Sequence, residues 1–383
     1  MPHKLVAGEL IEAAQRATGL QRFDSESFRE GLDILLADAS KVEYSDAGVQ
    51  RFRDAVVSAL SNRLKSTAYL DQRPELLKRP IERPVFVFGI PRTGTTLLSN
   101  LLAADPARRS PLTWEIEDPV PPPTKDTLYT DPRALARLEM ERQMLAARPD
   151  VGKYYRFSAI YPNECMFFIQ SDFKALMWEG RGKLPNYRDW LFQTDLTSTY
   201  QYHKRFLQLL QADAPGTWNL KQPSHGLWIE TLLKIYPDAR LVWTHRDPLT
   251  ATGSFCSLMK MGAGAFGAQP DLQWLGTNYP WQAVEHANRI MNSREKLGHD
   301  RIIDVHYADL MRNPIPTMRG LYKSLGDEFT AEAENGMRTW LADNPQDKFG
   351  KHEYKLAQFG LTPEQVRGSF ERYLSKYEVE REG

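Results

Sequence analysis

Residues 85–98 decide the fold, and they read Val85-Phe86-Val87-Phe88-Gly89-Ile90-Pro91-Arg92-Thr93-Gly94-Thr95-Thr96-Leu97-Leu98. The first four residues are β-branched or aromatic, which is typical of a buried parallel strand. A polar turn follows Gly89, and the apolar spacing from Leu97 to Ala104 predicts a helix. Backbone N–H groups of such a turn and of the first helical turn point outward. The stretch therefore predicts a pocket for phosphate or sulfate oxygens.

The spacing of Gly89 and Gly94 is the same as that of the two glycines in the phosphate loop of nucleoside triphosphatases. In those enzymes a lysine follows the second glycine, where this chain has Thr95. Thr95 stands at that lysine position, so ATP or GTP chemistry is the weaker interpretation. The loop carries its cation at Arg92, whose planar guanidinium can bind two oxygens of one phosphate group. Gly94 lets the backbone approach the anion, and Thr95 and Thr96 add hydroxyl donors. A turn that merely joins strand to helix is the alternative.

The segment from Arg92 through Thr93 and Gly94 to Thr95-Thr96 resembles the 5′-phosphosulfate-binding loop of one enzyme family. These are the sulfotransferases that use 3′-phosphoadenosine 5′-phosphosulfate (PAPS). The match is to the proline-arginine form found in tyrosylprotein and many bacterial members. The resemblance implies PAPS as the sulfuryl donor and these five residues as its 5′ contacts.

A second motif supports the same resemblance. Arg246 ends a predicted strand, Pro248 follows two positions later, and Ser254 follows eight positions later. In the family this pattern holds the 3′-phosphate of the nucleotide, and a guanidinium with a hydroxyl suits that group. A surface pair of Arg246 with Asp247 is the alternative. Tyr307, after a predicted strand, resembles the family tyrosine that contacts adenine, or it packs at the strand end.

Lys351 and His352 resemble, less closely, the late basic segment that closes over the 3′-phosphate. The family's arginine-lysine-glycine pattern is absent there, and a solvated loop is the alternative. The resemblance implies no metal in the reaction, and the eight histidines form no recognisable metal-binding motif. Two cysteines, Cys165 and Cys256, exclude a disulfide framework and suggest buried thiols in a reducing cytosol.

The reaction also needs a base for the proton of the acceptor. Glu115 is the first candidate, because a glutamate shortly after the loop helix has this part in the tyrosylprotein enzymes and in a bacterial carbohydrate branch. His225 is the second, since cytosolic sulfotransferases place a histidine just after a lysine that Lys221 matches. Pro223 occupies the aligned histidine position, so His225 is displaced by two residues. Glu164, at a predicted helix start, is either a third candidate or a helix-terminus charge.

These motifs predict an α/β, P-loop-like three-layer fold with a central, mainly parallel sheet and helices on both faces. Apolar residues at helical spacing, with a capping box from Ser27 to Glu30, predict a helical extension over residues 1–80 before the sulfotransferase domain of residues 81–383. We expect further elements from local patterns: strands at 111–115, 218–221, 239–246 and 302–307, a helix at 163–180, and a glycine-rich lid loop at 261–270.

Basic and acidic residues number 49 each, so no net field attracts nucleic acid or an anionic membrane. No apolar run long enough for a signal peptide or a membrane span is present, which favours a cytoplasmic protein. We expect a small, apolar or aromatic acceptor and a possible homodimer. A phosphate-loop kinase or nucleotide triphosphatase, and a non-enzymatic nucleotide sensor, are the competing functions.

Overall fold

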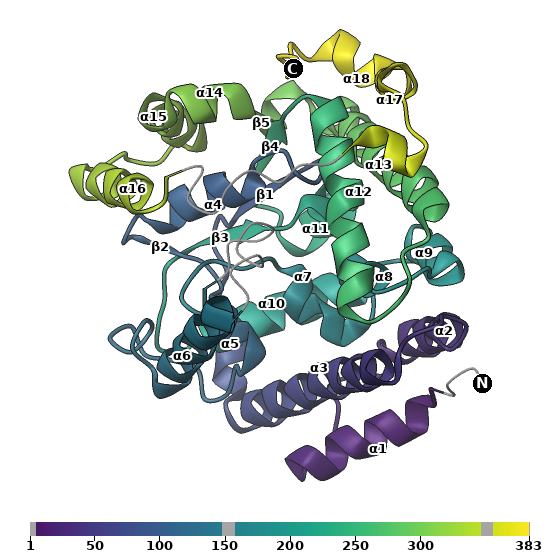
Figure 1. Ribbon diagram of the computed structural model, residues 1–383. Coiled ribbons are helices and arrows are strands. Elements are labelled where there is room, and N and C mark those ends of the chain that lie inside the picture. The colour runs from purple at the N-terminus through teal and green to yellow at the C-terminus, as the bar shows by residue number, and fades with distance from the viewer. Residues whose placement is uncertain (1–4, 148–157, 346–354, 383) are drawn as a thin grey trace.

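The computed structural model describes residues 5–147, 158–345 and 355–382 (Figure 1). At its centre lies a parallel sheet of five strands in the order β2-β3-β1-β4-β5. The strands are β1 (Val85–Gly89), β2 (Arg108–Arg109), β3 (Thr217–Lys221), β4 (Arg240–His245) and β5 (Ile302–His306). Helices surround this sheet, so the predicted α/β fold with a central parallel sheet is confirmed.

Alternate side chains of β1 enter different parts of the core. Val85 and Val87 pack in a cluster with residues of α4 (Thr95–Ala103), α15 (Pro314–Leu325) and α16 (Ala331–Asp343). Phe86 and Phe88 belong instead to the largest cluster, with residues of α10 (Thr197–Leu210), α11 (Ile229–Ile235) and α13 (Leu272–Leu297). The strand is therefore buried on both faces, as a continuous apolar run predicts.

Before β1 the described residues form the helices α1 (Ala7–Thr18), α2 (Arg29–Ala39), α3 (Asp46–Gln72) and η1 (Pro74–Lys78). Helices α1, α2 and α3 lie along the lower edge of Figure 1. Their buried residues, including Phe28 and Phe52, share the cluster of Phe86. The guanidinium of Arg63, on α3, is buried between Asp24 at 2.7 Å and Asp172 at 2.8 Å. An ion pair and a common apolar core thus join the N-terminal helices to the rest.

The other helices are α5 (Thr113–Glu117), α6 (Pro132–Ala147), α7 (Met166–Ile169), η3 (Gln170–Asp172), α8 (Leu176–Glu179), α9 (Pro185–Leu191), η4 (Pro223–Leu227), α12 (Pro248–Ala265), η5 (His299–Arg301), α14 (Tyr307–Arg312), η6 (Leu356–Phe359), α17 (Pro363–Ser369) and α18 (Glu371–Lys376). Asp247 caps α12 as predicted, because its carboxylate accepts from the N–H of Leu249 at 3.0 Å. In the described residues no helix combines the length and the apolar character needed to cross a bilayer.

Two predicted elements are wrong in kind. Residues 111–115 are not a strand, because the chain turns after the two-residue β2 and enters helix α5 at Thr113. The proposed capping box at Ser27 does not form, since helix α2 begins at Arg29 and the Ser27 hydroxyl donates to Asp172 at 2.5 Å. In both places a tertiary contact or a neighbouring turn outweighs the local pattern.

Two further predictions differ in extent. The predicted helix at 163–180 is interrupted at Phe173, whose φ of 52° ends η3 before α8 begins. The predicted lid loop at 261–270 is helical up to Ala265, as part of α12. Gly262 lies on this helix against α8, where an added Cβ would stand 3.0 Å from the carbonyl oxygen of Gly180. Glycine serves close packing there rather than chain flexibility.

Candidate active site

The site lies where parallel strands end at one edge of the sheet. Register pairs Gly89 with Thr244, Val87 with Lys221 and His245 with His306, so β1, β3, β4 and β5 end at similar heights. The loops that leave these strands therefore meet at one edge. Ligands of open α/β sheets bind outside the carboxyl ends of the strands.

The loop between β1 and α4 holds two residues in the left-handed region, Arg92 at φ 74° and Gly94 at φ 93°. An arginine there is uncommon, and such strain concentrates at functional sites. Gly94 also lies against Tyr307, and a Cβ at Gly94 would stand 2.5 Å from its ring. Thr93 faces inward, and its hydroxyl donates to the carbonyl oxygen of Ile90 at 2.7 Å. Only the backbone of Thr93 can therefore serve a ligand.

The two arginine motifs contact each other. Nε of Arg92 donates to the hydroxyl oxygen of Ser254 on α12 at 3.0 Å. Nη1 of Arg246 donates to the carbonyl oxygen of Arg92 at 3.0 Å. Two segments far apart in sequence thus border the same site.

A carboxylate of the chain itself occupies the fork of Arg246. Nε and Nη2 donate to the two oxygens of Glu382, at 2.6 and 2.7 Å. The backbone N–H of Glu382 donates to Asp247 at 2.9 Å, which fixes the segment in place. The Arg246 guanidinium also stacks on Tyr307, 4.1 Å from the ring centroid. Arg246 thus presents a planar, stacked cation with a bidentate acidic partner.

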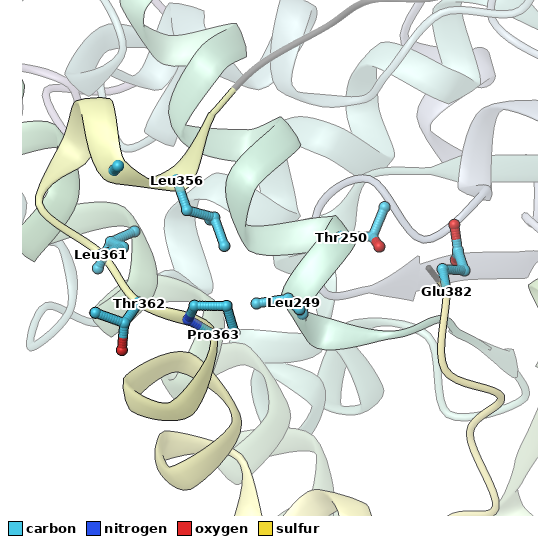
Figure 2. A pocket seen from close by; sticks show the side chains of 8 residues that line it. Leu249, Thr250, Leu356, Leu361, Thr362, Pro363 and Glu382 are labelled. Carbon is cyan, nitrogen blue, oxygen red and sulfur yellow. The ribbon is translucent and has the colours of Figure 1, made fainter.

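A pocket of about 540 Å³ borders this ion pair (Figure 2). Leu249 and Thr250, from the first turn of α12, form one wall. The segment from Leu356 to Pro363 forms the opposite wall, and Glu382 stands at one end. The pocket therefore offers apolar walls beside a charged end.

A second ion pair lies close to the loop. Nζ of Lys221, at the end of β3, donates to Glu164 at 2.7 Å and lies 3.5 Å from the hydroxyl of Thr96. The Lys221 side chain is 2% exposed, whereas that of Glu164 is 14% exposed. The carboxylate is thus the solvent-accessible member of a pair that lies beside the first turn of α4.

Glu115 is not available as the base that its sequence position suggests. Its side chain is completely buried on α5, and the guanidinium of Arg109 donates to both of its oxygens. One of these oxygens also accepts from the N–H of Leu112 at 3.0 Å. A carboxylate held in this way is closed to solvent, and both of its oxygens already have partners in the core.

His225 is equally unsuited to act as the base. It lies fully buried in η4, with its ring centroid 5.0 Å from that of Phe86. Burial lowers the pKa of His225 to about 3. Glu164 is consequently the one of the three candidate bases that solvent reaches. Lys351 and His352, which are predicted to close over the 3′-phosphate, lie outside the described residues.

A sequence profile described as "Sulfotransferase family" matches residues 84–331, which include β1, the Arg92 loop, Lys221, Arg246, Ser254 and Tyr307. The chain belongs to the sulfotransferase family. It is thus a sulfotransferase enzyme, as the paired motifs predict.

Solved structures agree with this assignment along the whole sulfotransferase chain. Sulfotransferase STF9 from Mycobacterium avium is 41% identical with a TM-score of 0.91, and the match covers 99% of this chain and 98% of that one. Sulfotransferase STF1 from Mycobacterium tuberculosis H37Rv is 31% identical with a TM-score of 0.87, covering 97% and 99%. A curated relative, omega-hydroxy-beta-dihydromenaquinone-9 sulfotransferase Stf3 of Mycobacterium tuberculosis, is 25% identical over 76% of this chain and 74% of its own length.

Proposed function

We propose that this sulfotransferase uses PAPS as its donor and transfers the sulfuryl group to a hydroxyl or amine of a small, apolar or aromatic acceptor. The observation that carries the proposal is the direct contact between the two phosphate motifs. Arg92 donates to Ser254, and Arg246 donates to the backbone of Arg92. Because the two motifs adjoin each other, a single nucleotide with phosphates at its 5′ and 3′ positions would contact both of them.

The donor's 5′ side is assigned to the loop. Backbone N–H groups at the start of α4 and the hydroxyls of Thr95 and Thr96 bind the phosphosulfate oxygens, helped by the positive end of the helix. The guanidinium of Arg92 neutralises charge on the leaving phosphate. The 3′-phosphate takes the place of Glu382 on Arg246 and contacts Ser254, while Tyr307 lines the adenine side.

Glu164 is the proposed base. Sulfuryl transfer passes through a trigonal SO₃-like group between two in-line oxygens, so the enzyme mainly positions the reactants and stabilises charge. The Glu164 carboxylate accepts the proton of the attacking group. Lys221 contacts both Glu164 and Thr96, which places its ammonium group between the base and the donor loop. Lys221 can therefore stabilise the bridging oxygen as the S–O bond breaks.

The acceptor class is supported by one relative's name. That relative, Stf3, is named for omega-hydroxy-beta-dihydromenaquinone-9, a hydroxyl-bearing compound. We therefore favour an apolar alcohol or phenol over a charged sugar.

The donor is tested by thermal shift. 3′-Phosphoadenosine 5′-phosphate should raise the melting temperature without magnesium, whereas ATP with magnesium should not. Arg246→Ala should bind this nucleotide and adenosine 5′-phosphate equally well. Full discrimination by the variant would contradict the 3′ assignment, and stabilisation by ATP alone would favour a kinase.

The reaction is tested with ³⁵S-labelled PAPS and a library of alcohols, phenols and amines. Glu164→Gln should lose turnover while keeping nucleotide affinity, and Glu117→Gln, on exposed α5 surface, is the matched control. Full turnover in Glu164→Gln would exclude the proposed base. Nucleotide binding without label transfer to any acceptor would favour a non-enzymatic sensor.

A further inference from the structure

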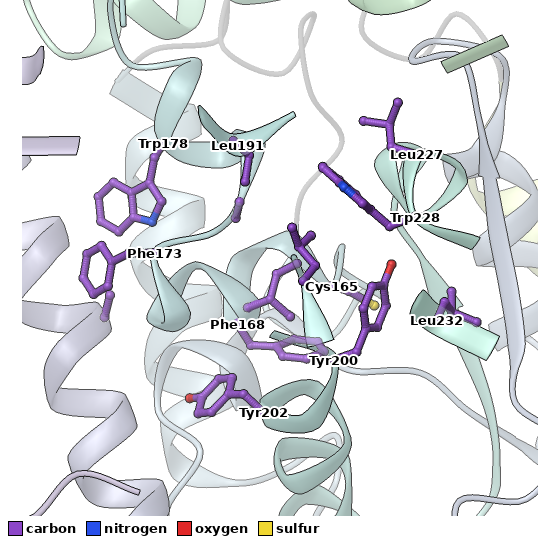
Figure 3. Close-up of a cluster of buried hydrophobic side chains, with 14 of the residues drawn as sticks. Cys165, Phe168, Phe173, Trp178, Leu191, Tyr200, Tyr202, Leu227, Trp228 and Leu232 are labelled. Carbon is purple, nitrogen blue, oxygen red and sulfur yellow. The ribbon is translucent and has the colours of Figure 1, made fainter. Parts of the chain in front are cut away.

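Three side chains with metal-binding atoms meet in the core behind the active site. Cys165 precedes α7, His203 lies on α10, and His225 lies in η4. One ligand atom from each lies within 4.8 Å of the others, and all three residues are fully buried. Figure 3 shows Cys165 beside Tyr200 within a cluster of buried hydrophobic side chains. The sequence gives no hint of this group, because its members belong to three separate elements.

The hydrogen bonds of the two imidazoles leave one nitrogen of each ring unused. Nδ1 of His225 bonds the hydroxyl of Tyr200 at 2.9 Å, and Nδ1 of His203 bonds that of Tyr236 at 2.6 Å. Nε2 of each ring is buried and has no hydrogen-bond partner among the described residues. Buried polar atoms are normally satisfied. When Nδ1–H donates to a tyrosine oxygen, Nε2 keeps a free lone pair, which is the arrangement of metal-bound histidines.

The surroundings of the three ligand atoms are apolar. The ring centroid of Phe168 lies 4.9 Å from that of His203, and Phe86 packs against both imidazoles. A bound ion would therefore lie among aromatic rings, where an unbalanced charge is costly.

We propose that Cys165 Sγ and the Nε2 atoms of His203 and His225 form a three-coordinate site for a soft monovalent metal ion of the Cu⁺ class. Binding forms a metal–sulfur bond, breaks the S–H bond and releases the proton to solvent. One thiolate and one monovalent cation sum to zero charge, which suits an apolar core. Zn²⁺ would leave a positive charge and requires a fourth ligand. No fourth His, Cys, Asp or Glu of the described residues belongs to this group.

The spacing is compatible with a bound ion after a small adjustment. Atoms 4.8 Å apart lie roughly 2.8 Å from their common centre, and metal–ligand bonds are about 2.0–2.3 Å. Each ligand atom would move inward by roughly 0.5–0.8 Å, which side-chain rotation supplies.

The position of the site suggests a structural role. Cys165 directly follows Glu164, and its N–H donates to the carbonyl oxygen of Lys221 at 3.0 Å. His225 follows β3 by four residues. An ion here would connect the segments of Glu164 and Lys221 to α10. Any effect of the ion on catalysis through Glu164 and Lys221 rests on the proposed function, whereas metal binding itself does not.

The experiment is metal loading of the full chain. Because the group is closed to solvent, protein is refolded with Ag⁺, a redox-inert substitute for Cu⁺, or with Cu⁺ under reductant. Bound metal is then counted by mass spectrometry after gel filtration. We expect one ion per chain, a raised melting temperature, and an X-ray absorption spectrum with one sulfur and two nitrogen ligands.

The two buried cysteines supply the control. Cys165→Ser should lose at least tenfold in metal affinity, and His203→Gln should behave alike. Cys256→Ser should bind like the unaltered chain, because Cys256 contacts the carbonyl oxygen of Leu275 and belongs to no such group. Nucleotide binding serves as the folding check for every variant. The site is overturned if the Cys165 and Cys256 variants bind equal amounts of metal. It is also overturned if the unaltered chain, refolded in the presence of the metal, holds no bound ion. Preferential Zn²⁺ uptake overturns the monovalent assignment.

Discussion

Glu382 occupies the position that we assign to the 3′-phosphate, so removing its charge should strengthen nucleotide binding. The Glu382 carboxylate bonds Arg246 through both oxygens, and a ligand phosphate must displace it. Glu382→Gln keeps the size of the side chain and removes its negative charge. The variant should therefore bind 3′-phosphoadenosine 5′-phosphate more tightly.

The size of the gain follows from the exposure of the pair. Geometry is bidentate, which favours a strong interaction, but the Arg246 and Glu382 side chains are 19% and 35% exposed. Solvent screening therefore reduces the free-energy contribution of this ion pair to about 1 kcal/mol. Without Glu382 as a competitor for Arg246, the dissociation constant of the nucleotide should fall about fivefold, since 1.4 kcal/mol corresponds to about tenfold.

Calorimetry with two nucleotides tests this prediction. The gain in affinity should appear with 3′-phosphoadenosine 5′-phosphate. It should not appear with adenosine 5′-phosphate, which lacks the 3′-phosphate that competes with Glu382. Glu380→Gln is the matched control, because Glu380 pairs with Arg312 at the surface and should leave both affinities unchanged. Unchanged or weaker binding of the 3′-phosphorylated nucleotide by Glu382→Gln would refute the reasoning, as would an equal gain for both nucleotides.

Three further perturbations test the site and the fold. Gly94→Ala should lower the free energy of unfolding by about 1–2 kcal/mol and weaken nucleotide binding, because φ is 93° and the new Cβ meets Tyr307. Gly320→Ala is the control, since it lies in open space on α15 and should stabilise the fold slightly. Chemical denaturation measures both changes. Arg63→Met should lower the free energy of unfolding by about 3–5 kcal/mol in the same measurement, since it leaves the buried Asp172 carboxylate without the counter-ion that Arg63 provides. Burial raises the pKa of Glu179 to about 7, so the folded state holds a proton that the unfolded state releases above its carboxyl pKa of about 4.5. Stability should fall by about 2–3 kcal/mol between pH 4.5 and 7, and Glu179→Gln should abolish this fall in urea titrations.

Sequence reasoning succeeds where local chemistry dictates local structure. The apolar run at Val85–Gly89 forms a strand that is buried on both faces, and its alternating residues divide between two clusters. Asp247 before a proline caps a helix, because both residues favour that position. Strand ends meet at one edge of any parallel sheet. The approach of the Arg92 and Arg246 motifs is therefore foreseeable from sequence.

The same reasoning fails where a residue's role depends on a distant partner. Glu115 is the first candidate base because of its place shortly after the loop helix, in a stretch that is expected to be a strand. The chain instead turns into α5, and Arg109 holds the carboxylate in the core. Glu164 gains its position from Lys221 on β3, and Glu382 gains its position from Arg246 on the loop after β4. No local pattern carries these pairings, because each partner lies on another element.

Two cations of the proposed site, Arg246 and Lys221, are paired with carboxylates of the chain, yet the two pairs should respond differently to the donor. A phosphate monoester brings more charge and more acceptor oxygens than Glu382, so it replaces that residue on Arg246. Glu164 stays in place. Lys221 already lies 3.5 Å from Thr96, and donor oxygens at the loop draw its ammonium group away from Glu164. The carboxylate oxygen that Lys221 releases can then accept a hydrogen bond from the acceptor. On this mechanism donor binding itself frees Glu164, so proton abstraction from the acceptor follows occupation of the donor site.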